Sequence, residues 1–275
     1  MGIPTDHRAA SGGETPGRSV SEACVLEHWA GPIVTLTLHN PGKLNAFSAG
    51  MRDALIAAFS RLNAEPACRA IVLTGKDGNF SSGAEVGGWN ESSVRECRTR
   101  LKRGGAQLMR EIVAGAKPVI AAVEGYAYGA GMALCCGADH LIADASARFC
   151  CAFTKLAFIP DLALMYTLPR RVGFAKAKQL IALAETIDAE RAERLGLVDE
   201  VTAPGQALTR ATAVAEQYAQ GPPLAFELVK SAFARDLESM IQAEMDLQPY
   251  AWLSEDHSEG KRALEERRKP SFKGR

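Results

Sequence analysis

Two short glycine-containing stretches decide how this chain folds and what it can bind: FSSGAEV at residues 80–86 and GYAYGAG at residues 125–131. Each follows an apolar run typical of a buried strand and leads into a helical segment. Small residues allow the backbone to approach a ligand closely, and the first N–H groups of a helix have no partner within that helix. Two such groups can form an oxyanion hole, in which fixed donors stabilise a negative charge that develops on an oxygen during reaction.

The composition is that of an ordinary globular protein. With 275 residues and 47% hydrophobic content, the chain can bury a full core, as one domain with an appendage or as two modest domains. Lys plus Arg and Asp plus Glu are both 32, so the net charge gives no reason to expect a nucleic acid or an anionic membrane as partner.

The cysteines indicate a reducing, cytoplasmic environment. There are seven of them, with no CxxC spacing and no secretory signal ahead of them. The adjacent pairs at residues 135–136 and 150–151 could be read as metal ligands, but the only histidine nearby is His140. Small apolar cysteines in a core are much commoner, so we expect no metal.

The hydrophobic pattern predicts an α/β protein with a largely parallel sheet. Residues 24–29 and 33–39 are expected to form two strands joined by a tight turn. Short apolar runs closed by Gly or Asp are typical of strands buried on both faces, and three occur, at residues 70–74, 119–123 and 140–143. Helical segments alternate with these runs, which favours parallel pairing.

Helix signals lie between and after these strands. Ser48 is a favoured cap residue, and apolar residues recur behind it at helical spacing. A further helix is expected from about residue 92 to 114. After Val201 the strand signals stop. The predicted organisation is therefore a disordered leader at residues 1–22, an α/β core at 23–204 and a helical region at 205–275.

Residues 119–138 are nearly free of charge and almost long enough for a membrane span. Glu124 lies within them, and glycine recurs four times from Gly125 to Gly137. A buried strand, a glycine-rich turn and a buried helix explain this pattern better than a bilayer does. We therefore expect no membrane association.

Six landmarks, in this order, carry a resemblance to a known family. They are NPGKLNA at residues 40–46, FSSGAEV at 80–86, KPVIAAVEG at 117–125, LPRRVG at 168–173, AERLGLV at 192–198 and RRKPSFKGR at 267–275. With them the chain resembles the crotonase superfamily, the enoyl-CoA hydratases and isomerases, from about residue 24 to 275. The resemblance implies a spiral of β-β-α repeats with a C-terminal helical oligomerisation region that builds homotrimers or hexamers.

The same resemblance implies an acyl-CoA thioester substrate, with coenzyme A as its carrier part and no separate cofactor. The two oxyanion donors of the family carry over to the N–H groups of Ala84 and Ala130. Lys43 and Leu44 match the loop that contacts coenzyme A, although Lys43 can equally be a solvated turn residue. The other expected substrate contacts are Glu85, Val86 and Phe153.

The acid–base residues depart from the hydratase pattern. Family hydratases use two glutamates, whose positions here are occupied by Ala133 and Phe153, and neither can accept a proton. Asp161 stands where several family isomerases, including those of phenylacetate degradation, carry their acidic residue. Its neighbours are apolar, so burial is expected to raise its pKa above the ordinary value of roughly 3.9. The alternative is that Asp161 caps the helix that follows.

Three hypotheses follow from these residues. The first is an isomerase that shifts a double bond through an enolate, with Asp161 as the base that moves the proton. The second is an enoyl-CoA hydratase that uses an unconventional acid. The third is an acyl-CoA-binding protein that has kept the fold and lost the chemistry.

Overall fold

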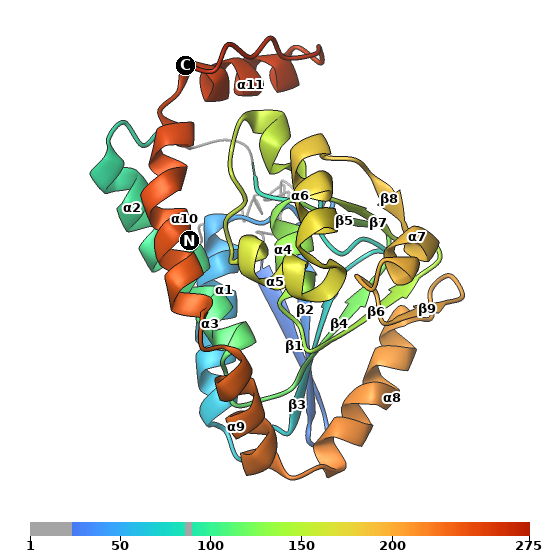
Figure 1. The fold of residues 1–275 in the computed structure, drawn as a ribbon. Helices are drawn as coiled ribbons and strands as arrows, with labels where there is room; N and C mark the ends of the chain where they lie inside the picture. Colours follow the sequence, from blue (N-terminus) through green and yellow to red (C-terminus); the bar gives the residue numbers. More distant parts are fainter. Residues whose placement is uncertain (1–23, 86–89) are drawn as a thin grey trace, which may run out of the picture.

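The larger sheet of the protein has six strands in the order β1-β2-β3-β4-β6-β9 (Figure 1). A computed structural model describes residues 24–85 and 90–275, so the predicted leader and Val86 lie outside the described residues. The first pair is antiparallel and every other pair is parallel. The strands are β1 (Cys24–Ala30), β2 (Ile33–His39), β3 (Ala70–Gly75), β4 (Val119–Val123), β6 (His140–Asp144) and β9 (Glu200–Thr202). The strands predicted from the apolar runs are confirmed.

The strands that directly follow β4 and β6 belong to a smaller sheet. It has the order β5-β7-β8, formed by β5 (Tyr126–Tyr128), β7 (Arg148–Cys150) and β8 (Ile187–Asp188). Twice the chain runs through one strand of each sheet and then a helix: β4, β5 and α4 (Ala130–Cys136), then β6, β7 and the 3₁₀ helix η1 (Ala152–Leu156). This confirms the expected repeat of β-β-α units.

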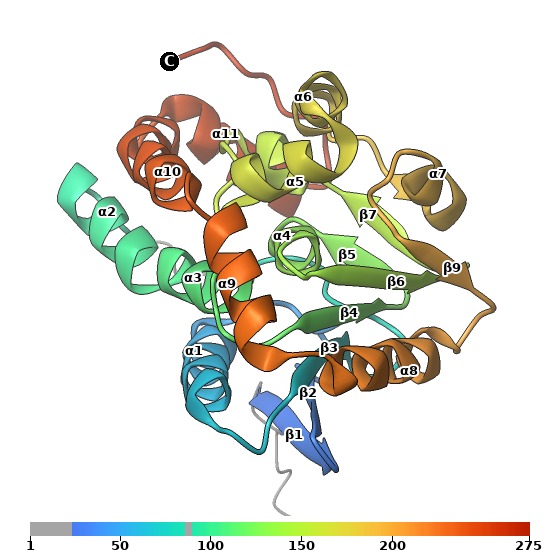
Figure 2. The same ribbon diagram turned by 60° about the horizontal axis from the view of Figure 1, so that its bottom comes forward.

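Helices cover both faces of the larger sheet (Figure 2). α8 (Ala207–Gln220) packs on one face, against β3, β4 and β6. Along β3 the side chains alternate: Ala70 and Val72 join the core beneath α8, whereas Ile71 and Leu73 join the larger core on the opposite face. Both faces of the strand are therefore buried, which explains why its sequence is an unbroken apolar run.

Helix α1 (Ala49–Ala64) begins as predicted, because the Ser48 side chain accepts a hydrogen bond from the N–H of Met51 at 3.1 Å. The single helix expected at residues 92–114 is a wrong prediction. It is two helices, α2 (Val94–Arg103) and α3 (Gly105–Val113), which meet at Gly104. The Gly104-Gly105 pair permits the break, since glycine is the poorest helix former after proline.

The remaining described elements are helical. They are α5 (Leu164–Val172), α6 (Phe174–Leu183) and α7 (Ala189–Arg194), and in the last part of the chain α9 (Pro223–Phe233), α10 (Leu237–Trp252) and α11 (Glu255–Glu265). α10 lies alongside α2 and also contacts α5. No helix within residues 24–85 and 90–275 has the length and apolar character needed to cross a bilayer.

A buried lysine fastens α9 to the α/β core. Lys230 is only 4% exposed, and its Nζ lies 2.7 Å from the Asp139 carboxylate. Nζ also donates to the backbone carbonyls of Ile112 and Lys117, at 2.8 and 2.9 Å. Because burial disfavours its charge, the pKa of Lys230 is lowered, and these three acceptors compensate for the lost hydration.

We expect Lys230→Met to lower the free energy of unfolding by about 3 kcal/mol, the lower end of the range for breaking a buried ion pair. The effect stays at the lower end because Asp139 keeps the N–H of Val119 as a donor. Urea unfolding measures the change. Lys178→Met, at an exposed position, is the control. Equal midpoints for the two variants would show that Lys230 does not fasten α9.

Candidate active site

Backbone hydrogen bonds hold the two glycine-containing loops side by side. The N–H of Ser81 donates to the carbonyl of Tyr126 at 2.7 Å, and the N–H of Tyr128 donates to the carbonyl of Ser81 at 3.0 Å. The Ser81 hydroxyl donates to the carbonyl of Asn45 at 2.8 Å. A Cβ on Gly131 would lie 2.8 Å from the Cβ of Ser81, so only glycine permits this approach. The two loops are therefore fixed relative to each other.

Ala84 and Ala130 occupy equivalent places in these loops. Each follows a glycine in the left-handed region, Gly83 at φ 105° and Gly129 at φ 49°. On either side of Ala84 the backbone is bound to Phe47, which donates to the Gly83 carbonyl at 2.8 Å and accepts from Glu85 at 3.1 Å. Among the described residues, neither the Ala84 nor the Ala130 N–H donates to a protein group. Both amides are thus available to a ligand.

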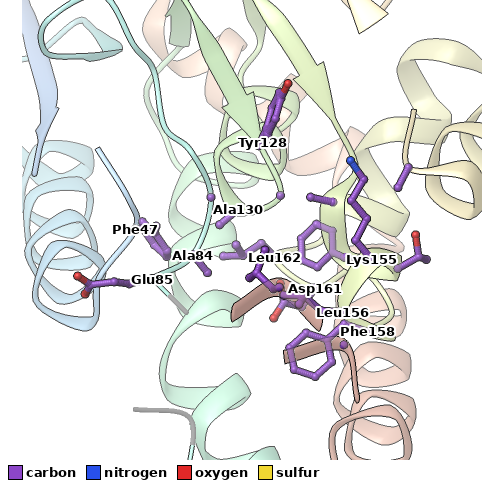
Figure 3. Close-up of a pocket in the computed structure, with 18 of the residues that line it drawn as sticks. Phe47, Ala84, Glu85, Tyr128, Ala130, Lys155, Leu156, Phe158, Asp161 and Leu162 are labelled. Atoms are coloured by element: carbon purple, nitrogen blue, oxygen red, sulfur yellow. The ribbon is translucent and has the colours of Figure 1, made fainter. Parts of the chain in front are cut away.

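Both alanines line one cavity of about 920 Å³ (Figure 3). The cavity lies where the two loops meet η1, the segment before α5, and the last helices of the chain. Its wall beyond the loops is largely apolar and includes Leu101, Leu156, Phe158, Leu162, Trp252 and Leu264. The cavity can hold a ligand that has an apolar part and one oxygen near the amides.

Asp161 also lines this cavity, on the segment between η1 and α5. Figure 3 shows it beside Leu156, Phe158 and Leu162, with the Glu85 side chain directed away from it. The residue that precedes α5 is Ala163, and no side chain caps this helix. The structure therefore does not support the alternative that Asp161 is an N-cap.

The surroundings of Asp161 make it a weaker acid than an ordinary aspartate side chain. Burial disfavours the carboxylate and raises its pKa to about 6, although the positive charge of Arg100 acts in the opposite direction. A pKa in this range leaves the group largely ionised at neutral pH and able to take a proton and return it, as a general base requires.

Of the other predicted site residues, some line the cavity and others do not. Glu85 and Phe153 line the cavity, and Phe153 is 9% exposed on η1. Lys43 and Leu44 are not among the lining residues. The Lys43 side chain forms an ion pair with Glu85, and the Leu44 carbonyl accepts from the N–H of Ser82 in the first loop. Val86 lies outside the described residues.

The cavity also contains basic residues that were not predicted as site residues. They are Arg52, Arg100, Lys155, Arg268 and Lys269. Arg268 and Lys269 belong to the RRKPSFKGR landmark at residues 267–275, so the sequence held a signal for them. The other three come from three different elements and follow no motif, so only the fold brings them together.

The described residues contain no group of three or more His, Cys, Asp or Glu side chains that could hold a metal ion. All seven cysteines are free, and Cys135, Cys136, Cys150 and Cys151 are buried in the core. Burial raises the pKa of Cys135 and Cys151, which keeps these thiols protonated and unreactive.

Comparison with known proteins decides the family. The enoyl-CoA hydratase/isomerase family matches residues 29–275. The chain belongs to this family, and thus to the crotonase superfamily. It is an acyl-CoA enzyme of that family. Its expected fold class, mixed α/β with a helical C-terminal region, is the crotonase fold.

Individual crotonase relatives carry different names. The chain is 38% identical to a probable enoyl-CoA hydratase of Rhodobacter capsulatus over 88% of this chain and 95% of the relative. It is 33% identical to the 1,2-epoxyphenylacetyl-CoA isomerase of Escherichia coli, over 91% and 98% of the two chains. A crystal structure of an enoyl-CoA hydratase from Mycobacterium avium subsp. paratuberculosis matches 92% of this chain and 99% of its own, with a TM-score of 0.80 at 27% identity.

We expect Gly131→Ala to weaken acyl-CoA binding and to lower the free energy of unfolding by about 1–3 kcal/mol, because the added methyl pushes the two loops apart. Calorimetric titration with a saturated acyl-CoA and urea unfolding measure the two effects. Gly50→Ala is the matched control, since its Cβ would meet nothing closer than 4.0 Å. Wild-type affinity and stability in Gly131→Ala would contradict this account of the loops.

Proposed function

We propose that this protein is an enoyl-CoA isomerase that moves a double bond through an oxyanion-stabilised enolate. The observation that carries the proposal is that Asp161 lines the same cavity as the two available amides of Ala84 and Ala130. The hydratase glutamate positions hold Ala133 and Phe153, so the pair of groups that activates water is absent from them.

The proposed reaction needs one base and one oxyanion site. The Asp161 carboxylate removes a proton from C2 of a 3-enoyl-CoA, and the electron pair moves onto the thioester oxygen as the dienolate forms. The N–H groups of Ala84 and Ala130 donate to that oxygen while it carries the charge. Protonated Asp161 then returns the proton to C4, the double bond moves to C2–C3, and the carboxylate is restored.

Two other observations support this assignment. Asp161 and Glu85 are the only acidic side chains among the described residues that line the cavity, and Glu85 is ion-paired to Lys43. The relative from Escherichia coli is named a 1,2-epoxyphenylacetyl-CoA isomerase, that is, an isomerase of an acyl-CoA. We infer that the apolar wall around Asp161 takes the acyl chain, and that the basic lining residues other than Arg100, which acts on Asp161, face the phosphates of coenzyme A.

Hydration is the second candidate, because several relatives are named probable enoyl-CoA hydratases. In that case an acid outside the family pattern would supply the second group, and Glu85 is the other carboxyl group on the cavity wall, although its side chain is directed away from Asp161. The third candidate, an inactive acyl-CoA-binding protein, would use the amides and the cavity without proton transfer.

One incubation separates the three candidates. In deuterated water, we expect the protein to convert a 3-enoyl-CoA to its 2-enoyl isomer with incorporation of deuterium. Mass spectrometry of the product measures the incorporated label. Asp161→Asn is expected to lower the rate by about 10²–10⁴-fold, the usual contribution of a general base. Asp77→Asn, at an exposed turn outside the cavity lining, is the control. Hydration of a 2-enoyl-CoA, or binding without turnover, would replace the proposal by the second or third candidate.

The pH dependence follows from the pKa of Asp161. The base must be ionised, so kcat/KM is expected to rise with pH through about 6 and to level off above it. Below that pH the protonated carboxyl cannot accept a proton and activity is lost. A profile of kcat/KM from pH 4.5 to 8 measures this. A flat profile across this range would exclude Asp161 as the base.

We also propose that the protein assembles as a homotrimer through α9. This helix leaves large apolar side chains in solvent, including Phe233 at 80%, Leu224 at 66% and Leu228 at 60% exposure. A row of this kind on one surface helix is typical of a protein–protein interface. A neighbouring copy of the chain in the trimer would cover this face of α9 with a different part of its own surface.

Sedimentation equilibrium tests the assembly. We expect a mass of about three times the 29.4 kDa of one chain at micromolar concentration, and dissociation when Phe233 and Leu228 are both replaced by Glu, because charge at an interface core is strongly disfavoured. Leu26→Glu, on the edge strand β1, is the control. A monomeric wild-type protein would overturn the proposal.

A further inference from the structure

The segment that carries Asp161 is hydrogen-bonded to two buried side chains of α10. Gln248 is fully buried and binds Ile159 at both backbone groups: its Nε2 donates to the Ile159 carbonyl at 2.8 Å, and its Oε1 accepts from the Ile159 N–H at 3.1 Å. One turn earlier, Glu244 is 4% exposed, and its Oε2 accepts from the N–H of Ala163 at 3.1 Å. The two side chains are four residues apart on one face of the helix and bind the chain on either side of Asp161.

The segment needs such support because its backbone is strained. Leu162 and Ala163 follow Asp161 with φ of 53° and 52°, in the left-handed region. Non-glycine residues in this region are disfavoured by roughly 1–2 kcal/mol each, so the conformation persists only where the surroundings hold it. Leu162 is also packed so closely on Gly105 that a Cβ there would lie 2.9 Å from its Cδ2. The direction of the Asp161 side chain therefore depends on contacts made by its neighbours.

Helix α10 is fixed to the core by its buried apolar residues Leu237, Ile241 and Trp252. The ion pairs of Asp246 with Arg98 of α2 and of Glu238 with Arg110 of α3 are exposed and add little. The buried face with Glu244 and Gln248 therefore has a fixed position relative to the cavity.

We propose that Glu244 and Gln248 are positioning residues for the isomerisation, holding the segment 159–163 so that the Asp161 carboxylate faces the acyl group. The inference rests on the proposed function, in which Asp161 is the base. Neither residue lines the cavity, so each reaches the substrate only through the segment and Asp161.

Glu244 serves as a neutral acceptor in this arrangement. Burial and the neighbouring charge of Asp161 raise its pKa to about 8, so it is protonated at neutral pH. The charge of Asp161 acts on Glu244 of α10, and the positive charge of Arg100 on α2 acts on Asp161. With Glu244 neutral, the single negative charge of the pair stays on Asp161, where the reaction uses it.

The chemistry predicts different results for two replacements of the same residue. Glu244→Gln keeps an oxygen acceptor for the Ala163 N–H and resembles the neutral carboxyl group. We expect it to retain kcat within about threefold below pH 8, whereas Glu244→Leu and Gln248→Leu lose roughly tenfold to a hundredfold in kcat, since a displacement of about 1 Å can cost 10²-fold. KM is expected to change less than threefold, because the amides of Ala84 and Ala130 stay in place.

Hydrogen exchange gives a readout that does not depend on turnover. Peptides that span residues 156–166 are expected to exchange faster in Glu244→Leu and Gln248→Leu than in the wild type, and Glu244→Gln to resemble the wild type. Gln242→Leu is the matched control, because Gln242 is exposed on the same helix and its side chain bonds, among the described residues, to Asp246 alone. It is expected to change neither kcat nor exchange in the segment.

Asp161→Asn, assayed in parallel, separates failure of this inference from failure of the proposed function. If Asp161→Asn keeps full turnover, Asp161 is not the base and the proposed function fails. If Asp161→Asn is inactive while Glu244→Leu and Gln248→Leu have wild-type kcat and exchange, the positioning role alone is overturned. Equal loss of kcat in Glu244→Gln and Glu244→Leu would also overturn it, because the charge of Glu244 and not its acceptor oxygen would then matter.

Discussion

The pairing of Ser81 with Tyr126 and Tyr128 is the contact on which the site depends. Through these backbone hydrogen bonds the loop after β3 lies against the start of the smaller sheet, and Gly131 allows the two to touch. The Ala84 and Ala130 amides are then held by the main chain and not by mobile side chains. Donors fixed in this way need no reorganisation when charge develops, which is the condition for effective oxyanion stabilisation.

The two loops form one half of the site, and the segment with Asp161 forms the other half. The loops come from the α/β core, whereas the Asp161 segment has strained backbone and takes its support from α10 in the helical region. The same fold can therefore keep the two loops and vary the segment before α5. Such a division is consistent with relatives named both hydratase and isomerase in one family.

Much of the fold could be predicted because its signals are local. The apolar runs at β3, β4 and β6 and the cap at Ser48 depend on neighbouring residues, and the motifs around Ala84 and Ala130 are contiguous in sequence. The break at Gly104 is not predicted, although the Gly104-Gly105 pair is a local signal, because the residues on both sides of it favour a helix. The role of Glu244 and Gln248 cannot be predicted from the sequence, because they lie more than eighty residues from the segment that they bind. In the sequence they are two ordinary polar residues of a helix. Long-range contacts of this kind appear only when the chain is folded.

A crystal structure of the protein with a bound 3-enoyl-CoA or a stable analogue of its dienolate tests the central claim most directly. The account predicts the thioester oxygen within about 3 Å of the nitrogen atoms of both Ala84 and Ala130, as hydrogen bonds require, with the Asp161 carboxylate next to C2 and C4 of the acyl chain. A thioester oxygen that contacts neither amide, or an acyl chain bound away from Asp161, would contradict it.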